Sequence, residues 1–467
     1  MLLRNRMGCG LGFLFGKRPP WVPGPPPPPP PPPPDPDPDP VYADADLESA
    51  RVFQAFVASF EQGGDAAQEL FEAFPAIQTE LGVPVELADL GPLTPASEHP
   101  NWNTNDYIRP PSSGATVEGI DLPGYIYTGS ITGQITVRYV NFRAPVSGAK
   151  SYSVNRGVGG PIDFIIEDCR AKDFRSAFNS SNGAMTIRRV FVTEGGADAF
   201  KAGGGGPVRI ENFWGEKLGQ GVGSHADGIQ ISVGRDIDIN RGMIWSVPDG
   251  PYSTGDLGGY NTGIYIHGTL GDKHCEDIVC AGVVFAWGGY YRIHVFPQHT
   301  DSVVRNILVA HNVCAPLAFK GSSYKSTGET GQVHPGMSDQ SSGGQGLIEN
   351  VVFWKNHIPG YGPVVYSHLG GPFGDIDGIW HWNPATLSDK LRVLLQDIGL
   401  LDANGDPVPG AVRSLAGAIT TQTRSVPSTG GVALNLDLSS IPSDATNITV
   451  HVPSGSPIVL EYTDQTA

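Results

Sequence analysis

Short apolar–polar segments recur through the middle of the chain and can be aligned with one another. They return at intervals of about 22 to 35 residues, a period typical of stacked, solenoid architectures. Their apolar positions are Phe178, Phe200, Ile229, Ile264, Ile293 and Phe319, and the polar residues that follow are Asn179, Lys201, Gln230, Tyr265, His294 and Lys320. The pattern predicts one buried column of apolar side chains and, beside it, one outward stripe of polar side chains.

A second family of alternating strands lies between these segments. It comprises residues 135–142, 164–169, 185–192, 208–214, 237–241, 276–280, 303–308 and 346–353. Alternation places one set of side chains toward a core and the other set outward. Asn, or a substitute for it, recurs in these strands and predicts a turn ladder at a corner of the fold. Two strand families that each recur once per repeat predict a parallel β-helix.

Residues 130–385 resemble the right-handed β-helix, or pectate-lyase-like, superfamily. The segment Ser-His-Ala-Asp-Gly-Ile-Gln at 224–230 is similar to a coil signature common in that superfamily. The resemblance implies an all-β fold, a right-handed parallel β-helix solenoid. It does not select a reaction, because the superfamily includes polysaccharide lyases, glycoside hydrolases, esterases and non-enzymatic phage tailspikes.

The flanks of the repeats predict three further parts. Residues 1–40 join a basic, mildly apolar peptide to a proline run and three Asp-Pro steps, which predicts a docking peptide on a semi-rigid polyproline arm. Residues 41–94 show helical periodicity and predict a neck of two short helices, packed either between subunits or against the repeats. We assign residues 95–385 to the β-helix, beginning with an irregular entry cap over 95–129. Residues 386–467 are assigned to one helix and a small β domain.

Charge and hydropathy narrow the classes of partner. The 467-residue chain carries a formal net charge of −17, which disfavours nucleic acid and anionic membranes as partners. Its first residues lack the apolar core of a signal peptide, and no stretch approaches the roughly 20 apolar residues of a membrane span. We therefore expect a protein made in the cytoplasm without a signal peptide and not inserted in a membrane.

A candidate catalytic group lies just before the aligned apolar positions. Asp198 and Asp227 occupy equivalent places on successive repeats, roughly 5 Å apart, and Lys201 and His225 are expected on the same face. Carboxylates at that separation can serve as acid and nucleophile in retaining glycoside hydrolysis. Alternatively, Lys201 is the base of a lyase, with a divalent cation bridging the carboxylates to a uronate. A structural role stays open, because Asp before Gly commonly caps backbone amides in turns.

Aromatic residues concentrate on and beside the stripe. Tyr and Trp pair a flat apolar body with a polar tip, which suits sugar rings, and a long Gly-rich loop over 246–261 adds a recognition surface. The candidate substrate-binding residues are Gln230, Tyr265, His294, Trp245, Tyr252, Tyr260, Trp287 and Tyr291. No resident metal or other cofactor is expected apart from the divalent cation of the lyase alternative.

Three functions fit this organisation. The first is a phage tail fibre or tailspike, a receptor-binding protein that attaches the virion to host-surface polysaccharide. In this interpretation residues 1–40 dock on a virion tail protein, the fibre is a homotrimer by resemblance, and the protein is made in the host cytoplasm and located in the virion tail. The second is a polysaccharide-degrading lyase or glycoside hydrolase. The third is a non-enzymatic virion decoration protein.

Overall fold

The computed structural model describes residues 46–413, apart from internal segments. Those segments are residues 61–65, 145–151, 156–161, 181–182, 205, 219–225, 247–259, 269–273, 288–290, 296, 298–300, 316–332, 335–345, 359–361, 364, 368–371 and 376. The proline-rich arm at 1–40 and the small β domain predicted beyond residue 413 both lie outside the described residues.

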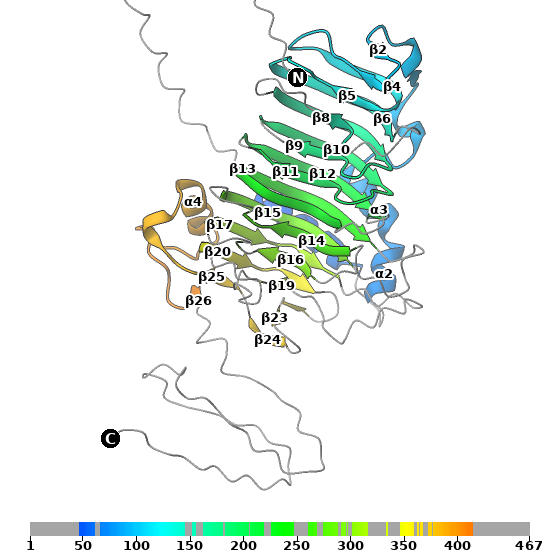
Figure 1. The fold of residues 1–467 in the computed structure, drawn as a ribbon. Coiled ribbons are helices and arrows are strands. Elements are labelled where there is room, and N and C mark those ends of the chain that lie inside the picture. The colour runs from blue at the N-terminus through cyan, green and yellow to red at the C-terminus, as the bar shows by residue number, and fades with distance from the viewer. Residues whose placement is uncertain are drawn as a thin grey trace, which may run out of the picture. The chain divides into compact units, whose positions relative to one another are not determined.

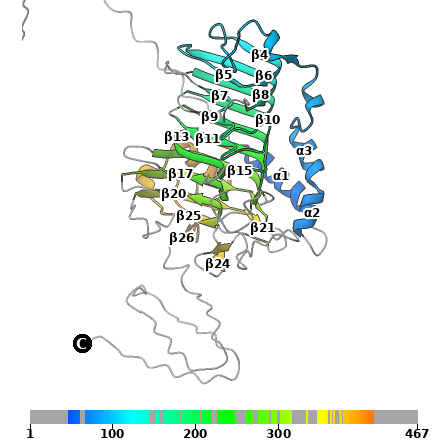
Figure 2. The same ribbon diagram turned by 45° about the vertical axis from the view of Figure 1, so that its right-hand side comes forward.

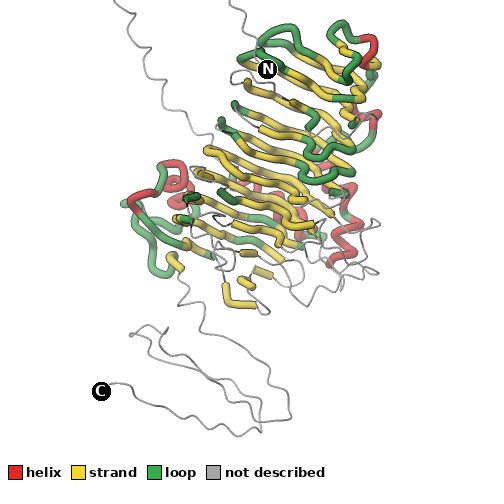
Figure 3. Tube along the Cα trace, in the orientation of Figure 1, coloured by secondary structure: helices red, strands yellow, loops and turns green. Residues whose placement is uncertain are grey.

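The described chain is mostly β-strand, and most strands belong to one large, mostly parallel sheet (Figures 1 and 3). A first ladder consists of β4 (Thr116–Pro123), β6 (Gly133–Arg143), β8 (Ile162–Lys172), β10 (Met185–Thr193), β12 (Val208–Glu216), β13 (Ala226–Ser246), β15 (His274–Trp287), β17 (Val303–Ala310) and β20 (Leu347–Trp354). A second ladder consists of β9 (Phe178–Ser180), β11 (Phe200–Gly203), β13, β14 (Tyr260–Ile266), β16 (Tyr291–Val295) and β19 (Val333–His334). The chain therefore returns to each ladder once per repeat.

Shorter elements lie at the two ends of these ladders. Near the beginning are η1 (Leu87–Leu90), β1 (Thr94–Pro95), η2 (Ala96–Glu98), β2 (Trp102–Asn103), β3 (Tyr107–Ile108), β5 (Tyr125–Tyr127) and β7 (Val154–Asn155). Toward the end are β18 (Val313–Cys314), β21 (His357–Ile358), β22 (Gly362–Pro363), β23 (Val365–Ser367), β24 (Pro372–Asp375), β25 (Gly378–Trp380), η4 (Pro384–Thr386) and β26 (Val412–Arg413). Because β4 and β5 already pair in parallel with later strands, the expectation of an irregular cap throughout 95–129 is wrong.

The predicted register is confirmed over five strands and wrong at the sixth. The paired and buried apolar residues are, in order, Phe178, Phe200, Ile229, Ile264 and Ile293. The strand that pairs next with Ile293 carries Val333, not Phe319. Val333 and His334 repeat the same apolar–polar pattern. The sequence alignment took residues 318–321 for the sixth strand, whereas that strand is β19.

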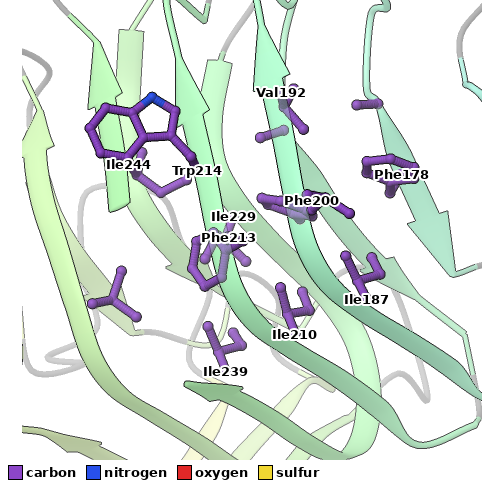
Figure 4. Close-up of a cluster of buried hydrophobic side chains, with 14 of the residues drawn as sticks. Phe178, Ile187, Val192, Phe200, Ile210, Phe213, Trp214, Ile229, Ile239 and Ile244 are labelled. Atoms are coloured by element: carbon purple, nitrogen blue, oxygen red, sulfur yellow. The ribbon is translucent and has the colours of Figure 1, made fainter. Parts of the chain in front are cut away.

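Stacked rings fill the space between the ladders (Figure 4). The rings of Phe178 and Phe200 lie nearly parallel with centroids 6.0 Å apart, and Phe213 meets Phe200 edge-on at 5.1 Å. All three side chains are fully buried. Each such burial contributes roughly 1.5–3 kcal/mol, so in-register stacking of large side chains supplies a large part of the stability.

Each repeat of the first ladder has a left-handed residue at one equivalent place, within the strand from β4 to β15 and directly after β17 and β20. We call this set the corner column; its φ angles lie between 49° and 64°. Its members are Gly119, Tyr139, Asp168, Arg189, Asn212, Arg241, Gly282, His311 and Lys355. Left-handed backbone costs roughly 1–2 kcal/mol for most residues, so the corner is kept by the pairing on both sides of it.

The turn ladder predicted within the strands is found at Asn306 and Asn350, where the Asn350 Nδ2 donates to the Asn306 Oδ1 at 3.2 Å. A second ladder, which the sequence did not predict, lies directly after the corner column. The Asn312 Oδ1 accepts the Val283 N–H at 2.8 Å, and the Asn312 Nδ2 donates to the Asn356 Oδ1 at 2.9 Å. All four amides are buried and join neighbouring repeats.

The predicted neck is three helices rather than two: α1 (Leu47–Ala58), α2 (Ala66–Glu72) and α3 (Phe74–Leu81). Pro75 lies in the first turn of α3, where its missing N–H removes no helical hydrogen bond, so it starts a helix instead of ending one. The helices lie beside the strands (Figure 2). They contact the corner column, since Arg241 bonds Glu80 at 2.9 Å and Gln54 donates to the Lys355 carbonyl at 2.7 Å. The sequence left open whether the neck packs between subunits or against the repeats. The described contacts of the neck are with the chain's own strands.

The helix predicted from Thr386 is confirmed as α4 (Asp389–Asp397), which covers outward apolar residues of the last strands, among them Val279, Leu308 and Val352. Its buried Lys390 reaches Asp236 at 2.8 Å and Asp238 at 2.6 Å. The outward side chains of earlier strands are charged, so α4 covers the sheet only where that face is apolar.

Gly282→Ala should destabilise the fold more than Gly119→Ala, although both residues have the same left-handed backbone. A Cβ on Gly282 would lie 2.8 Å from the Ala50 Cα of α1, whereas one on Gly119 would find its nearest neighbour at 3.9 Å. Backbone strain of roughly 1 kcal/mol applies to both, and overpacking adds roughly 1–3 kcal/mol at Gly282. Urea unfolding measures the difference. Equal losses would contradict the account of α1 packed on the corner column.

Candidate functional site

The polar stripe predicted beside the buried column is aligned strand by strand. Its members are Asn179, Lys201, Gln230, Tyr265 and His294, each paired with the next across the second ladder. The next position is His334, so the expectation that Lys320 continues the stripe is wrong, and Lys320 itself lies outside the described residues. We call the five aligned residues the stripe.

Exposure along the stripe is similar at four of its five members. Asn179, Lys201, Gln230 and His294 are half-buried and alternate with buried core residues, as an outward face requires. Tyr265 is only 9% exposed. The stripe is therefore interrupted at Tyr265 and accessible on either side of it.

The Tyr265 ring is held between two imidazoles. Its centroid lies 3.9 Å from that of His267 with the planes 12° apart, and 5.1 Å from that of His294 with the planes 19° apart. Offset stacks of this kind add roughly 0.5–1.5 kcal/mol beyond area burial. Tyr265 thus orients His294 more than it offers a surface of its own. His267 was missed in the sequence, although it follows Tyr265 by two residues and so shares its side of the strand.

The two candidate carboxylates lie on successive repeats as predicted, Asp198 just before β11 and Asp227 in β13, but both are buried. Asp198 is 4% and Asp227 1% exposed, whereas Lys201 is half-buried. The expectation that they share an exposed face with Lys201 is therefore wrong.

Asp198 is bonded to the strand before it and to the strand after it. Its Oδ1 accepts the Asp227 N–H at 3.0 Å, and its Oδ2 accepts the Ser176 hydroxyl at 3.3 Å. The Asp227 Oδ2 accepts the Gln230 Nε2 at 3.2 Å, which fixes a stripe residue from below. These contacts match the structural alternative, in which the carboxylate ties successive turns together.

The surroundings of Asp198 shift the pKa of its carboxyl group. Burial raises its pKa, and the Asp227 N–H and the Lys201 charge offset part of that shift. The Ser176 hydroxyl and the Arg175 charge act in the same direction as Lys201. Asp198 is therefore a buried carboxyl whose pKa is raised chiefly by its loss of hydration.

Trp245, expected on the sugar-binding face, is instead covered by the neck. It is 8% exposed, and its ring centroid lies 6.0 Å from that of Phe71 and 5.2 Å from that of Phe74. Trp245 was a candidate because aromatic residues concentrate in that part of the sequence. Nothing in the local sequence indicated that residues 66–81 would fold over it.

The remaining candidates cannot be placed by their side chains. His225 and Tyr252 lie outside the described residues. Tyr260, Trp287 and Tyr291 belong to β14, β15 and β16, but their side chains lie outside the described part of the structure. The proposed sugar-binding surface is therefore carried by Gln230 and His294, with Tyr265 beneath His294.

Neither a metal centre nor a membrane span is found in the part of the chain that the structure describes. No group of three or more His, Cys, Asp or Glu side chains there is arranged to hold an ion. Among the described helices, none has the length and apolar character needed to cross a membrane.

Comparison with known proteins leaves the site to be interpreted from its geometry. No family model, curated protein or solved structure matches this chain. The arrangement itself offers amide, ammonium and imidazole groups along successive strands, with no carboxylate among the five members of the stripe.

Asp198→Ala should lower the free energy of unfolding by about 1–3 kcal/mol, because it leaves buried donors without an acceptor. Asp198→Asn keeps an acceptor and removes the charge. Since the folded pKa of Asp198 is raised, the wild type loses stability as the pH rises through that value, and Asp198→Asn does not. The stability of the Asn variant relative to wild type should therefore rise as the pH increases from the ordinary aspartate pKa of about 4 through the raised pKa of Asp198. Denaturant titrations at several pH values measure this, and a flat difference would contradict the buried-carboxyl account.

Proposed function

We propose that this chain is a phage tail fibre or tailspike subunit that attaches the virion to a host-surface polysaccharide. The observation that carries the proposal is the stripe, a row of polar side chains aligned on successive parallel strands. A linear glycan is itself a repeating polar chain. A row of donors and acceptors at the interstrand spacing of about 4.8 Å offers it contacts along its length.

The proposed fold beneath the stripe is a right-handed parallel β-helix solenoid. Its support is that β13 belongs to both ladders and that each ladder joins strands separated by a full repeat. Parallel connections within a sheet are right-handed in nearly all proteins. Such a stack is rigid and elongated, which suits a fibre that reaches toward a surface.

The tail-fibre part of the proposal rests on the order of the segments. The proline-rich sequence at 1–40 precedes α1, and the cap residue of α1, Asp46, accepts a hydrogen bond from Asn240 of β13 at 3.3 Å. The arm is thus followed by a helix anchored on the middle of the first ladder. A virion tail protein is the proposed partner of residues 1–40, a homotrimer is the proposed assembly, and the virion tail is the proposed location.

The burial of Asp198 and Asp227 favours binding over cleavage. Glycoside hydrolysis needs an acid and a nucleophile within reach of the scissile bond. Both carboxylates are nearly inaccessible and are bonded to the protein. We therefore rank polysaccharide attachment first and polysaccharide degradation second. Virion decoration without polysaccharide binding ranks third.

The double variant Gln230→Ala with His294→Ala should weaken polysaccharide binding about tenfold or more, because it removes two polar contacts worth roughly 1 kcal/mol or more each. Binding is measured on immobilised capsules and lipopolysaccharides, with release of reducing ends or unsaturated products followed in parallel. Tyr139→Ala is the matched control, an exposed aromatic on the corner column away from the stripe. Equal binding by the double variant and wild type would remove the stripe as the binding face.

Deletion of residues 1–40 should abolish incorporation into virions while leaving polysaccharide binding by the isolated protein unchanged. The reason is that the described strands and helices begin after this segment. Sedimentation of virions followed by immunodetection measures incorporation. Incorporation of the truncated chain at the wild-type level would show that docking does not use the arm.

A further inference from the structure

The outward face of the smaller, four-stranded sheet is aromatic. This sheet consists of β2, β3, β5 and β7, which precede β9 in the chain. Tyr107 of β3 and Tyr125 of β5 are register partners, and Tyr127 lies two residues further along β5. All three tyrosines are half-buried and alternate with the fully buried Ile108 and Ile126, so they share the outward side. We call Tyr107, Tyr125 and Tyr127 the tyrosine platform.

The three rings of the platform contact one another. The Tyr107 ring centroid lies 5.7 Å from that of Tyr125, with the planes 43° apart, and 5.3 Å from that of Tyr127, with the planes 64° apart. Rings this close are in contact, so a ligand can meet only their outer surface. No described residue bonds the hydroxyl of Tyr107 or of Tyr127, and neither oxygen is buried. The platform thus offers apolar ring surface with accessible polar groups at its edge.

The turn between β2 and β3 holds the platform in place. The Asn103 Oδ1 accepts the Asn105 N–H at 2.9 Å, and the Asn103 carbonyl accepts the Asp106 N–H at 3.0 Å. The Asp106 carbonyl in turn accepts the Tyr125 N–H at 3.1 Å. A Cβ on Gly124 would lie 2.1 Å from that carbonyl oxygen, so this close approach requires glycine. The rings are therefore positioned by backbone contacts as well as by one another.

The platform leads toward the first member of the stripe. Tyr127 follows a buried isoleucine as Asn179 follows a buried phenylalanine. β5 pairs with β7, and the Ser153 N–H just before β7 donates to the Ala177 carbonyl just before β9 at 3.0 Å. Figure 2 shows β5, β7, β9 and β11 following one another along the stack. Two steps of about 4.8 Å therefore separate the strand of Tyr127 from that of Asn179.

We propose that the tyrosine platform is a second glycan subsite, on which the apolar face of a pyranose ring stacks, and that it extends the stripe beyond Asn179. The inference rests on the proposed function for the identity of the ligand as a glycan. The C–H groups on one face of a pyranose ring suit the flat body of tyrosine, and the sugar hydroxyls suit the accessible phenol groups. Because the platform residues are uncharged, binding there should not depend on salt.

Nitration of the full wild-type chain by tetranitromethane tests the platform without any substitution. Dextran, mannan and galactan are the probes, together with the polysaccharide selected in the binding assay. A stacked sugar ring should slow the nitration of Tyr107 and Tyr127 several-fold, at low and at high salt alike, and leave the exposed Tyr139 unchanged. Peptide mapping reads each tyrosine separately. Equal nitration of Tyr107 and Tyr127 with and without every one of these glycans would overturn the inference.

Substitutions at Tyr127 separate ring stacking from a structural role. Tyr127→Ala should weaken binding of the protecting glycan roughly three- to tenfold, the factor for one aromatic stack, whereas Tyr127→Phe keeps the ring and should bind close to wild type. Tyr139→Ala is the matched control, an exposed tyrosine of the corner column. Equal weakening by the Ala and Phe variants would contradict ring stacking.

The platform and the proposed function fail in different ways. If the host polysaccharide binds Tyr127→Ala as it binds wild type, while the double variant of Gln230 and His294 is weakened, the platform is overturned and the attachment function stands. If wild type binds no polysaccharide at all, the attachment function is overturned together with the platform.

Discussion

In-register parallel pairing across a left-handed corner is the constraint on which the rest of this structure depends. The strands from β4 to β15 pair with a neighbour on both sides of their corner-column residue, so a left-handed residue recurs at the same place in these repeats. The corner then fixes which side chains face inward. It also supplies the ridge on which α1 and α3 pack, through Gly282 and Arg241.

The same register produces both the core and the candidate site. A side chain that stacks on its equivalent inside the fold, such as Phe200 on Phe178, forces the next residue outward onto the stripe. Lys201 and Asn179 are therefore aligned because the phenylalanines before them are. Asp198 belongs to the same arrangement from the inner side, where it accepts hydrogen bonds from Ser176 in the repeat before it and from Asp227 in the repeat after it.

The sequence was sufficient where the information was local and periodic. The column from Phe178 to Ile293, the bonded pair Asn306 and Asn350 and the helix from Asp389 all follow from spacing and residue type. It failed where a distant segment decided the outcome. Trp245 was grouped with the aromatic residues of a sugar-binding surface, but Phe71 and Phe74 cover it. The burial of Asp198 and Asp227 and the packing of the neck on the strands required the structure.

The central claim is that the half-buried residues of the stripe, on β9, β11, β13 and β16, form the surface that meets a glycan. Hydrogen–deuterium exchange of the full chain, with and without the polysaccharide selected by binding, tests it most directly. The account predicts slower exchange in Phe178–Ser180, Phe200–Gly203, the first part of β13 and Tyr291–Val295, with no change in α1, α3 or α4. Protection confined to the neck helices or to α4, with these strands unchanged, would contradict it.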